Sequence, residues 1–87
     1  MLRLDTEVEW ALGSRTFRFG RKNPDVAVRG WFVSQELAMV AWTGRKHRLR
    51  RVGKWGKVLI NGKAVVMQDL EAGDTVQIGA TRFRYQL

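Results

Sequence analysis

Residues 19–34 read FGRKNPDVAVRGWFVS and combine two predicted strand ends, a basic corner and one hydroxyl group. Apolar and charged side chains alternate just before Gly20, so a strand is predicted to end at that glycine and to leave Arg21 on an exposed turn. The planar guanidinium group of Arg21 suits an anion because it donates two parallel hydrogen bonds. A second loop reaches Ser34 just before another strand begins, and two loops at one end of a sheet would bring Arg21 and Ser34 together.

The composition describes a single globular domain over residues 1–87. Hydrophobic residues make up 45% of the chain and charged residues 28%, a balance too apolar for a disordered protein. No apolar stretch approaches the roughly 20 residues that a membrane helix needs, and residues 1–10 alternate where a signal peptide would be continuous. We therefore expect a soluble, cytoplasmic protein without a membrane span. Because the chain has no Cys and one His, it offers no Cys-based zinc site and no His cluster, and we expect neither metal nor cofactor.

Hydrophobic alternation predicts the strands. Residues 2–10 place apolar side chains on one face and mostly charged ones on the other, which predicts one half-buried strand. A turn at Gly13 would join this strand to a hairpin partner at 16–19. The continuous apolar run LAMVAW at 37–42 predicts the central strand, buried on both faces, and residues 47–52 are expected to return antiparallel to it.

The dipeptide Asn61-Gly62 gives the strongest hairpin signal, because both central positions of a type I′ turn need positive φ. Further turns and alternating segments follow, and no segment shows a convincing 3.6-residue period. About ten short strands at this spacing predict an all-β fold, an antiparallel β-sandwich. Its predicted core includes Leu37, Met39, Val40, Val58, Ile60, Val76 and Ile78.

Several segments, in order and at compatible spacing, resemble the forkhead-associated (FHA) domain, a family of phosphothreonine-binding β-sandwiches. Phe-Gly-Arg at 19–21 resembles the family's hydrophobic-Gly-Arg, and Val-Ser at 33–34 resembles the start of its Ser-Arg-x-His element. The other matching segments are Asp-Val-Ala-Val at 25–28, Ile-Asn-Gly at 60–62, Leu-x-x-Gly-Asp-x-Val-x-Ile-Gly at 70–79 and Phe-Arg-Tyr at 83–85. The resemblance covers residues 16–86 and implies an FHA-like β-sandwich.

The resemblance also implies an interaction module that binds phosphothreonine-containing peptides through loops at one end of the sandwich. The family's phosphate ligands match Arg21 and Ser34, which supply a planar cation for two oxygens and a hydroxyl for a third. Gln35 stands where the family commonly has Arg, Leu37 stands where it has a His that braces the loops, and its backbone-holding Asn is missing from residues 53–57. The predicted phosphopeptide-binding residues are Arg21, Lys22, Ser34, Gln35, Lys54 and Lys57.

The charge balance favours acidic partners. Sixteen Lys and Arg against eight Asp and Glu give a net charge of +8, which suits phosphopeptides, acidic protein faces, nucleic acid or anionic lipid. The basic run 45–51 could contact such a partner, or it could protect an edge strand from pairing with another sheet. His47 lies near no Asp or Ser at a triad spacing, and no paired carboxylates or Walker motif occur, so we do not expect an enzyme.

Two other functions remain beside phosphothreonine recognition: an FHA fold that assembles with a protein without phosphate, and a basic binder of nucleic acid or membrane. Phosphate recognition requires Arg21 and Ser34 to converge on one anion, whereas phosphate-independent assembly would leave them apart or bonded internally. The basic binder needs residues 45–51 on one continuous surface with aromatic side chains. We expect a phosphorylated or acidic protein partner rather than nucleic acid, and a role as part of or accessory to a larger assembly.

Overall fold

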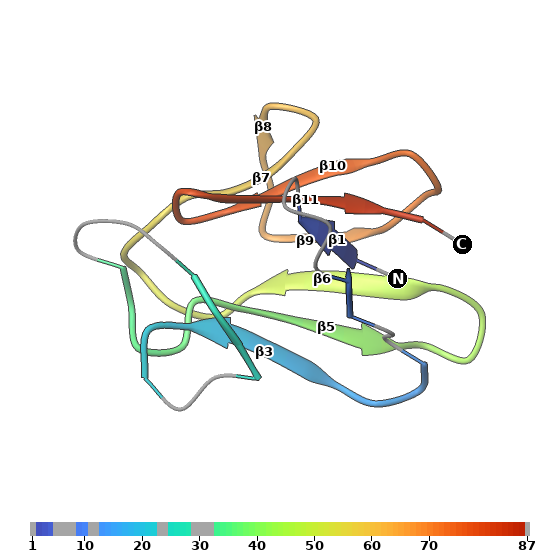
Figure 1. The fold of residues 1–87 in the computed structure, drawn as a ribbon, viewed down its shortest axis with the longest axis horizontal. Helices are drawn as coiled ribbons and strands as arrows, with labels where there is room; N and C mark the ends of the chain where they lie inside the picture. The colour runs from blue at the N-terminus through green and yellow to red at the C-terminus, as the bar shows by residue number, and fades with distance from the viewer. Residues whose placement is uncertain (1, 5–8, 11–12, 23–24, 29–32, 87) are drawn as a thin grey trace.

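The computed structural model describes residues 2–4, 9–10, 13–22, 25–28 and 33–86, which form eleven β-strands and, within these ranges, no helix. Two sheets pack face to face as a sandwich (Figure 1). The six-stranded sheet has the order β2 (Glu9–Trp10), β1 (Leu2–Leu4), β11 (Thr81–Tyr85), β10 (Thr75–Ile78), β7 (Val58–Ile60) and β8 (Lys63–Ala64). The five-stranded sheet has the order β4 (Val26–Ala27), β3 (Phe17–Gly20), β5 (Ala38–Trp42), β6 (His47–Arg51) and β9 (Met67–Asp69).

The predicted β-sandwich is therefore confirmed, with one correction to its strand directions. All neighbouring strands run antiparallel except β3 and β4, which pair in parallel through Phe19 and Val26. The hydrogen bond from the Val28 N–H group to the Gly20 carbonyl, 3.1 Å long, continues this pairing. Because of this parallel pair, β4, which follows Arg21 in the sequence, lies beside β3, which precedes Arg21.

Side chains from both sheets fill the core. The rings of Phe19 and Phe83 meet edge to face across the sandwich, with centroids 5.5 Å apart and planes at 74°. Six of the predicted core residues are buried: Leu37, Val40, Val58, Ile60, Val76 and Ile78. The prediction for Met39 is wrong in part, because Met39 is only half-buried and stands beside Arg18 and Arg50 on the outer face of its sheet.

Strand β5 lies in the middle of the five-stranded sheet, as predicted for residues 37–42, and β6 returns antiparallel to it. Trp42, at the last position of β5, lies on the same face as the fully buried Val40 and is 41% exposed. The expected burial on both faces is wrong, because Met39 and Ala41, on the other face, are only half-buried. Only one face of this sheet meets the other sheet, so alternate side chains of β5 point outward. The basic run does not protect a sheet edge, because β6 lies between β5 and β9.

The N-terminal segment does not form one strand. Strands β1 and β2 pair with each other antiparallel, with Leu2 opposite Trp10, and β1 also pairs with β11. Strand β3 belongs to the other sheet, so the hairpin expected across Gly13 is absent. A period-two pattern is the same for one long strand as for two short ones, which is why the alternation of residues 2–10 did not separate them.

The hairpin at Asn61 and Gly62 is confirmed. It joins β7 to β8, and the two residues have φ angles of 52° and 83°, both positive as a type I′ turn requires. The Asn61 side chain also bonds to the next turn, donating to Asp74 Oδ1 at 3.0 Å and accepting from the Thr75 N–H group at 3.0 Å. These bonds tie the two turns together at the six-stranded sheet.

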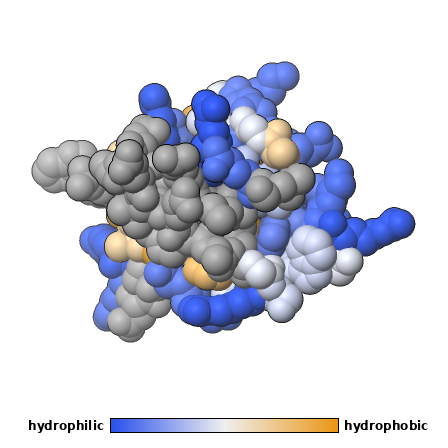
Figure 2. All heavy atoms as spheres, turned by 45° about the vertical axis from the view of Figure 1, so that its right-hand side comes forward, coloured by the Kyte–Doolittle hydropathy of each residue, from blue (hydrophilic) through white to orange (hydrophobic). Residues whose placement is uncertain are grey.

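Hydrophilic side chains occupy most of the described surface on the face shown in Figure 2. Two ends of the sandwich matter for function. At the end where β5 begins, the connections around Arg21, Ser34 and Trp55 meet; at the opposite end, β5 turns into β6 (left and right in Figure 1). No helix in the described ranges is long and apolar enough to cross a bilayer.

Candidate functional site

Three connections of the sandwich are bonded to one another at the end where β5 begins. The Gln35 carbonyl accepts hydrogen bonds from the N–H groups of Arg21 at 3.0 Å and Lys22 at 3.2 Å. The Ser34 N–H group donates to the Trp55 carbonyl at 2.8 Å, which joins the segment before β5 to the loop between β6 and β7. These backbone bonds bring the predicted site residues Arg21, Ser34 and Gln35 together.

The Ser34 hydroxyl is fixed in position by its neighbour. Its Oγ accepts a hydrogen bond from the Trp55 N–H group at 2.8 Å. A serine hydroxyl carries one donor as well as its acceptor lone pairs, so the Ser34 O–H group still has a proton to donate. Ser34 is half-buried and can present that proton to an anion at the surface.

Arg21, Val33, Ser34, Gln35 and Trp55 line one pocket with a volume of about 710 Å³, which we call the Arg21 pocket. Most of its wall is apolar. Trp55, which is 67% exposed, and the buried Val33 provide this apolar surface. One cation and one hydroxyl therefore open into a single pocket with a hydrophobic wall.

The charge of Arg21 is not neutralised by any described residue. Among the residues that the structure describes, the Arg21 side chain makes no ion pair, and the carboxylates of Asp25 and Glu36 are engaged elsewhere. Asp25 bonds to Arg15 Nη2 at 2.6 Å, and Glu36 bonds to Arg18 Nε at 2.9 Å. An exposed guanidinium group without a carboxylate beside it is suited to bind an anion from outside.

Asp25 holds the Arg21 turn against β3. Its carboxylate accepts from the Arg18 N–H group at 2.9 Å and from the Arg15 guanidinium group. The bond from the Arg18 backbone, assisted by Arg15, lowers the pKa of Asp25 below its ordinary value of 3.8. Asp25 was not among the predicted site residues, although it lies in the segment 25–28 that carries part of the resemblance.

Two glycines allow the connections to approach each other. A β-carbon at Gly20 would overlap the Gln35 carbonyl, and one at Gly53 would overlap the Ser34 side chain. Neither position has space for a larger residue, so the missing side chains are what permit Ser34 and Gln35 to lie against neighbouring loops. The sequence identified Gly20 as a strand end, but the contact that requires it is formed by residues distant in the chain.

Leu37, which the resemblance matched to the family's bracing His, is fully buried. Its N–H group donates to the Phe19 carbonyl at 2.8 Å, and its own carbonyl accepts from Val52 at 2.8 Å and Gly53 at 3.0 Å. The backbone of Leu37 thereby connects β3 with the loop after β6. Its side chain adds apolar packing beneath Gly56, without a polar group of its own.

None of the three predicted lysines is among the residues that line the Arg21 pocket. Lys22 is exposed on the same turn as Arg21. Lys54 is exposed in the loop after β6, where its carbonyl accepts from Arg51 Nη2 at 2.8 Å. Lys57 is exposed further along, and its carbonyl accepts from the Gly79 N–H group at 2.7 Å.

Two pocket residues, Val33 and Trp55, were missing from the predicted set, and Trp55 is the more exposed of the two. Its sequence signal was an aromatic residue between two lysines in a glycine-flanked loop, GKWGK. Residues 29–32, part of the loop that was expected to reach Ser34, lie outside the described residues. Within the described ranges, no group of three or more His, Cys, Asp or Glu side chains could hold a metal ion.

No family model matches the sequence, and no curated protein matches it significantly. Solved structures match closely in fold. The FhaA FHA domain, complexed with the intracellular domain of Rv3910, is 20% identical with a TM-score of 0.83, over 95% of this chain and 94% of that one. The FHA domain of CT664 from Chlamydia trachomatis is 19% identical with a TM-score of 0.81, over 95% and 91%.

Mycobacterium tuberculosis EmbR, in complex with a low-affinity phosphopeptide, is 20% identical with a TM-score of 0.87. The match covers 98% of this chain and 23% of the EmbR chain, so this chain corresponds to one part of EmbR. Together these similarities show that the chain has the FHA fold, which the sequence segments had indicated.

Proposed function

We propose that this chain is a protein-interaction module that binds phosphothreonine-containing peptides in the Arg21 pocket. The observation that carries the proposal is that Arg21 and Ser34, from two separate connections, line one pocket while the Arg21 guanidinium group pairs with no described carboxylate. In this arrangement Arg21 binds two phosphate oxygens and the Ser34 O–H group donates to a third. The chain acts by binding rather than by catalysis.

The charges around the pocket support the same ligand. A phosphothreonine carries about −1.5 to −2 charges at pH 7 and three strong acceptor oxygens. Lys22 is exposed on the same turn as Arg21, Lys54 and Lys57 are exposed in the segment that carries Trp55, and the chain has a net charge of +8, so the field of the protein attracts such a group. The apolar wall formed by Val33 and Trp55 can pack against the peptide beside the phosphate.

The similar structures support a phosphorylated partner. EmbR was solved with a low-affinity phosphopeptide, and another FHA structure with a TM-score of 0.86 comes from work on phosphothreonine-dependent FHA domain interactions. Gln35 and Leu37 depart from the family's pattern. These departures affect the affinity for the ligand rather than the kind of ligand, because the Arg21 guanidinium group and the Ser34 hydroxyl group are both still present. We expect micromolar affinity, since part of the binding free energy goes into ordering side chains at the site.

The experiment is a binding screen with a peptide library that contains phosphothreonine at its centre, compared with the same library without phosphate. We expect the phosphorylated library to bind and the unphosphorylated one not to bind. A phosphoserine library tests whether the threonine methyl group contributes. Equal binding of the phosphorylated and unphosphorylated libraries would instead support the alternative function, an FHA-fold assembly module that recognises its partner without phosphate.

A further inference from the structure

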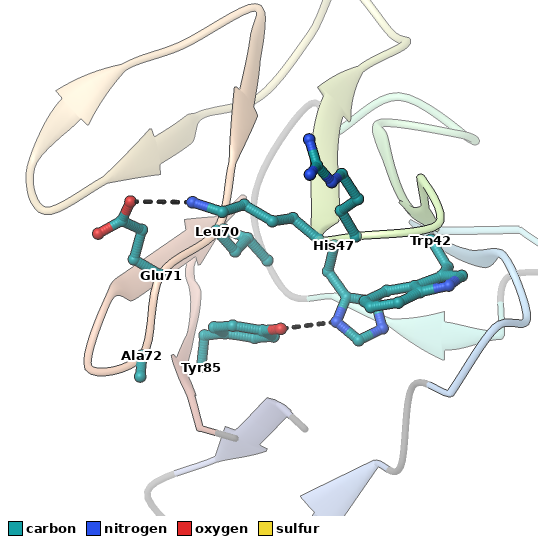
Figure 3. Close-up of a pocket in the computed structure, with 8 residues that line it drawn as sticks. Trp42, His47, Leu70, Glu71, Ala72 and Tyr85 are labelled. Carbon is teal, nitrogen blue, oxygen red and sulfur yellow. Dashed lines mark hydrogen bonds and ion pairs between the residues drawn. The ribbon is translucent and has the colours of Figure 1, made fainter.

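A second pocket lies at the opposite end of the sandwich, between the β5–β6 turn and the β9–β10 turn (Figure 3). Its volume is about 590 Å³, and we call it the Trp42 pocket. Strand β5 runs from one site to the other. It begins directly after Leu37, at the end of the sandwich that holds the Arg21 pocket, and it ends at Trp42. None of the residues lining the Trp42 pocket lines the Arg21 pocket, so a ligand in one leaves the other open.

One wall of the Trp42 pocket is a fixed group of aromatic rings. The buried His47 ring is bonded through both nitrogens, Nδ1 to Tyr85 Oη at 2.6 Å and Nε2 to the Gly13 carbonyl at 2.7 Å. The Trp42 ring lies over the His47 ring, with centroids 4.9 Å apart (Figure 3). Because Trp42 is 41% exposed, a large apolar surface is held in place by buried partners and remains open to a ligand.

The two turns that frame the pocket are closed by their own hydrogen bonds. In the β5–β6 turn, the Thr43 N–H group donates to the Lys46 carbonyl at 2.8 Å, and Thr43 Oγ1 accepts from the Lys46 N–H group at 3.1 Å. In the β9–β10 turn, the Glu71 N–H group donates to Asp74 Oδ2 at 2.8 Å, and the Asp74 N–H group donates to the Glu71 carbonyl at 3.0 Å. The pocket is therefore formed before a ligand arrives, which lowers the entropy cost of binding.

The rim of the pocket is basic. Arg45 makes no ion pair with any described residue, and the ion pair of Lys46 Nζ with Glu71 Oε1 is 3.3 Å long and solvent-exposed on both sides. Exposed pairs of this kind contribute little, so a carboxylate from a partner can replace Glu71 at low cost. The same two cations disfavour an ammonium ligand, although aromatic rings often bind one.

We propose that the Trp42 pocket is a second docking site, which takes an acidic segment of a partner protein. An apolar side chain of leucine size enters the pocket and packs against Trp42 and Leu70. Carboxylates on either side of it bind Arg45 and Lys46. The charge complementarity follows from the basic rim and from the net charge of +8. This site is independent of the proposed phosphopeptide function, and the two pockets together allow one partner to be held at both ends or two partners to be joined.

The probe is the peptide acetyl-Asp-Glu-Leu-Glu-Asp-amide, titrated into the ¹⁵N-labelled chain and followed by NMR. We expect saturable shifts of the Trp42 indole N–H group and of the Gly44 and Ala72 amides, with a dissociation constant in the millimolar range or below. Two control peptides separate the components: replacing Leu by Ser removes the apolar group, and replacing the acids by Asn and Gln removes the charges. Both controls should bind much more weakly. If the Ser peptide binds equally well, the interaction is non-specific attraction to a basic surface and the proposal is overturned.

Substitutions test whether the probe peptide binds in the Trp42 pocket. Arg45→Ala should lower the affinity for the probe peptide about fivefold, which is the effect of losing one exposed ion pair. Arg45→Lys keeps the charge and should therefore retain much of the affinity. Trp42→Ala should abolish saturable binding. Arg50→Ala, which removes an exposed Arg from the outer face of the sheet, is the matched control and should have no effect at physiological salt, where exposed charges are screened. All three mutated positions are exposed, and the remaining amide shifts report whether each variant is folded.

Besides equal binding of the Ser peptide, three results would overturn the proposal: no saturable shifts at about 10 mM peptide, equal binding by Trp42→Ala, or equal binding by the neutral peptide. Self-association of the chain that Trp42→Ala abolishes would also overturn it, because the occupant would then be a second copy. A phosphothreonine peptide bound in the Arg21 pocket should leave the Trp42 indole signal unchanged. Failure at the Trp42 pocket would therefore not affect the proposed phosphopeptide site.

Discussion

Ser34 and Trp55 bond to each other twice: the Ser34 N–H group donates to the Trp55 carbonyl at 2.8 Å, and the Trp55 N–H group donates to Ser34 Oγ at 2.8 Å. The two residues are distant in sequence, and this pair joins the segment before β5 to the loop after β6. The pair fixes both the hydroxyl that would meet a phosphate oxygen and the indole that forms the pocket wall. The shape of the Arg21 pocket therefore depends on it.

Ser34→Ala removes both the Oγ acceptor and the proposed phosphate donor. We expect phosphothreonine-peptide affinity to fall about tenfold, the lower end of the effect of losing one hydrogen bond to a charged group. The loss should be smaller than for Arg21→Ala, since Arg can make two such bonds. Isothermal titration calorimetry measures both changes. Ser14→Ala, at an exposed turn, is the matched control, and a Ser34→Ala protein with unchanged affinity would remove Ser34 from the site.

Asp25→Asn should lower stability at neutral pH and lose its effect in acid. The folded-state pKa of Asp25 is lowered below 3.8, so its contribution is complete above that value and disappears as the pH falls through the folded-state pKa. The bonds are partly solvent-exposed, and we expect a loss of about 0.5 to 1 kcal/mol at pH 7. Thermal unfolding of both proteins between pH 7 and pH 2 measures the difference. A difference that stays constant down to pH 2 would contradict this role of the carboxylate.

Tyr85→Phe tests the buried hydrogen bond between Tyr85 Oη and His47 Nδ1, which is 2.6 Å long. Burial of the phenol also raises the pKa of Tyr85. Removing the hydroxyl leaves a buried His47 nitrogen without its partner, and we expect the free energy of unfolding to fall by about 1 to 3 kcal/mol. Urea denaturation measures this change. Unchanged stability would mean that His47 finds another partner in the variant.

Neutralising Arg48 and Arg50 together tests whether the basic run is separate from specific recognition. Both side chains point outward from β6, and Arg48 bonds to Asp69 at 2.6 Å, away from the Arg21 pocket. We expect weaker association with acidic partners mainly at low salt, because salt screens exposed charges. Affinity for a phosphothreonine peptide should be compared at low and at physiological salt. Loss of specific binding at physiological salt would show that this surface belongs to the site.

Features that depend on neighbouring residues could be predicted from the sequence. The Asn61-Gly62 turn needs positive φ at both positions, and this local requirement identified the β7–β8 hairpin correctly. The apolar run at 37–42 identified the middle strand of its sheet. The exposure of Trp42 could not be foreseen, because Trp42 shares a face with the buried Val40 and its exposure depends on how far the other sheet extends over the end of β5.

The site was predictable only in part. Arg21 and Ser34 were predicted to converge from the two strand ends around residues 19–34, the resemblance matched them to phosphate ligands, and the structure places both at one pocket. Trp55 and Asp25 were missed because their roles are set by contacts across the fold: one bonds to Ser34, the other to the backbone of β3. The Trp42 pocket could not be seen in the sequence either, since Trp42 and Tyr85 come from different sheets.

The central claim is that Arg21 recognises phosphate, and calorimetry with one phosphothreonine peptide and its unphosphorylated copy tests it most directly. The account predicts that the native chain binds only the phosphorylated peptide and that Arg21→Ala lowers this affinity by about tenfold or more. Arg82→Ala, which removes an exposed Arg remote from the pocket lining, should bind like the native chain. Equal binding of both peptides, unaffected by Arg21→Ala, would contradict the claim and leave phosphate-independent assembly as the function of this fold.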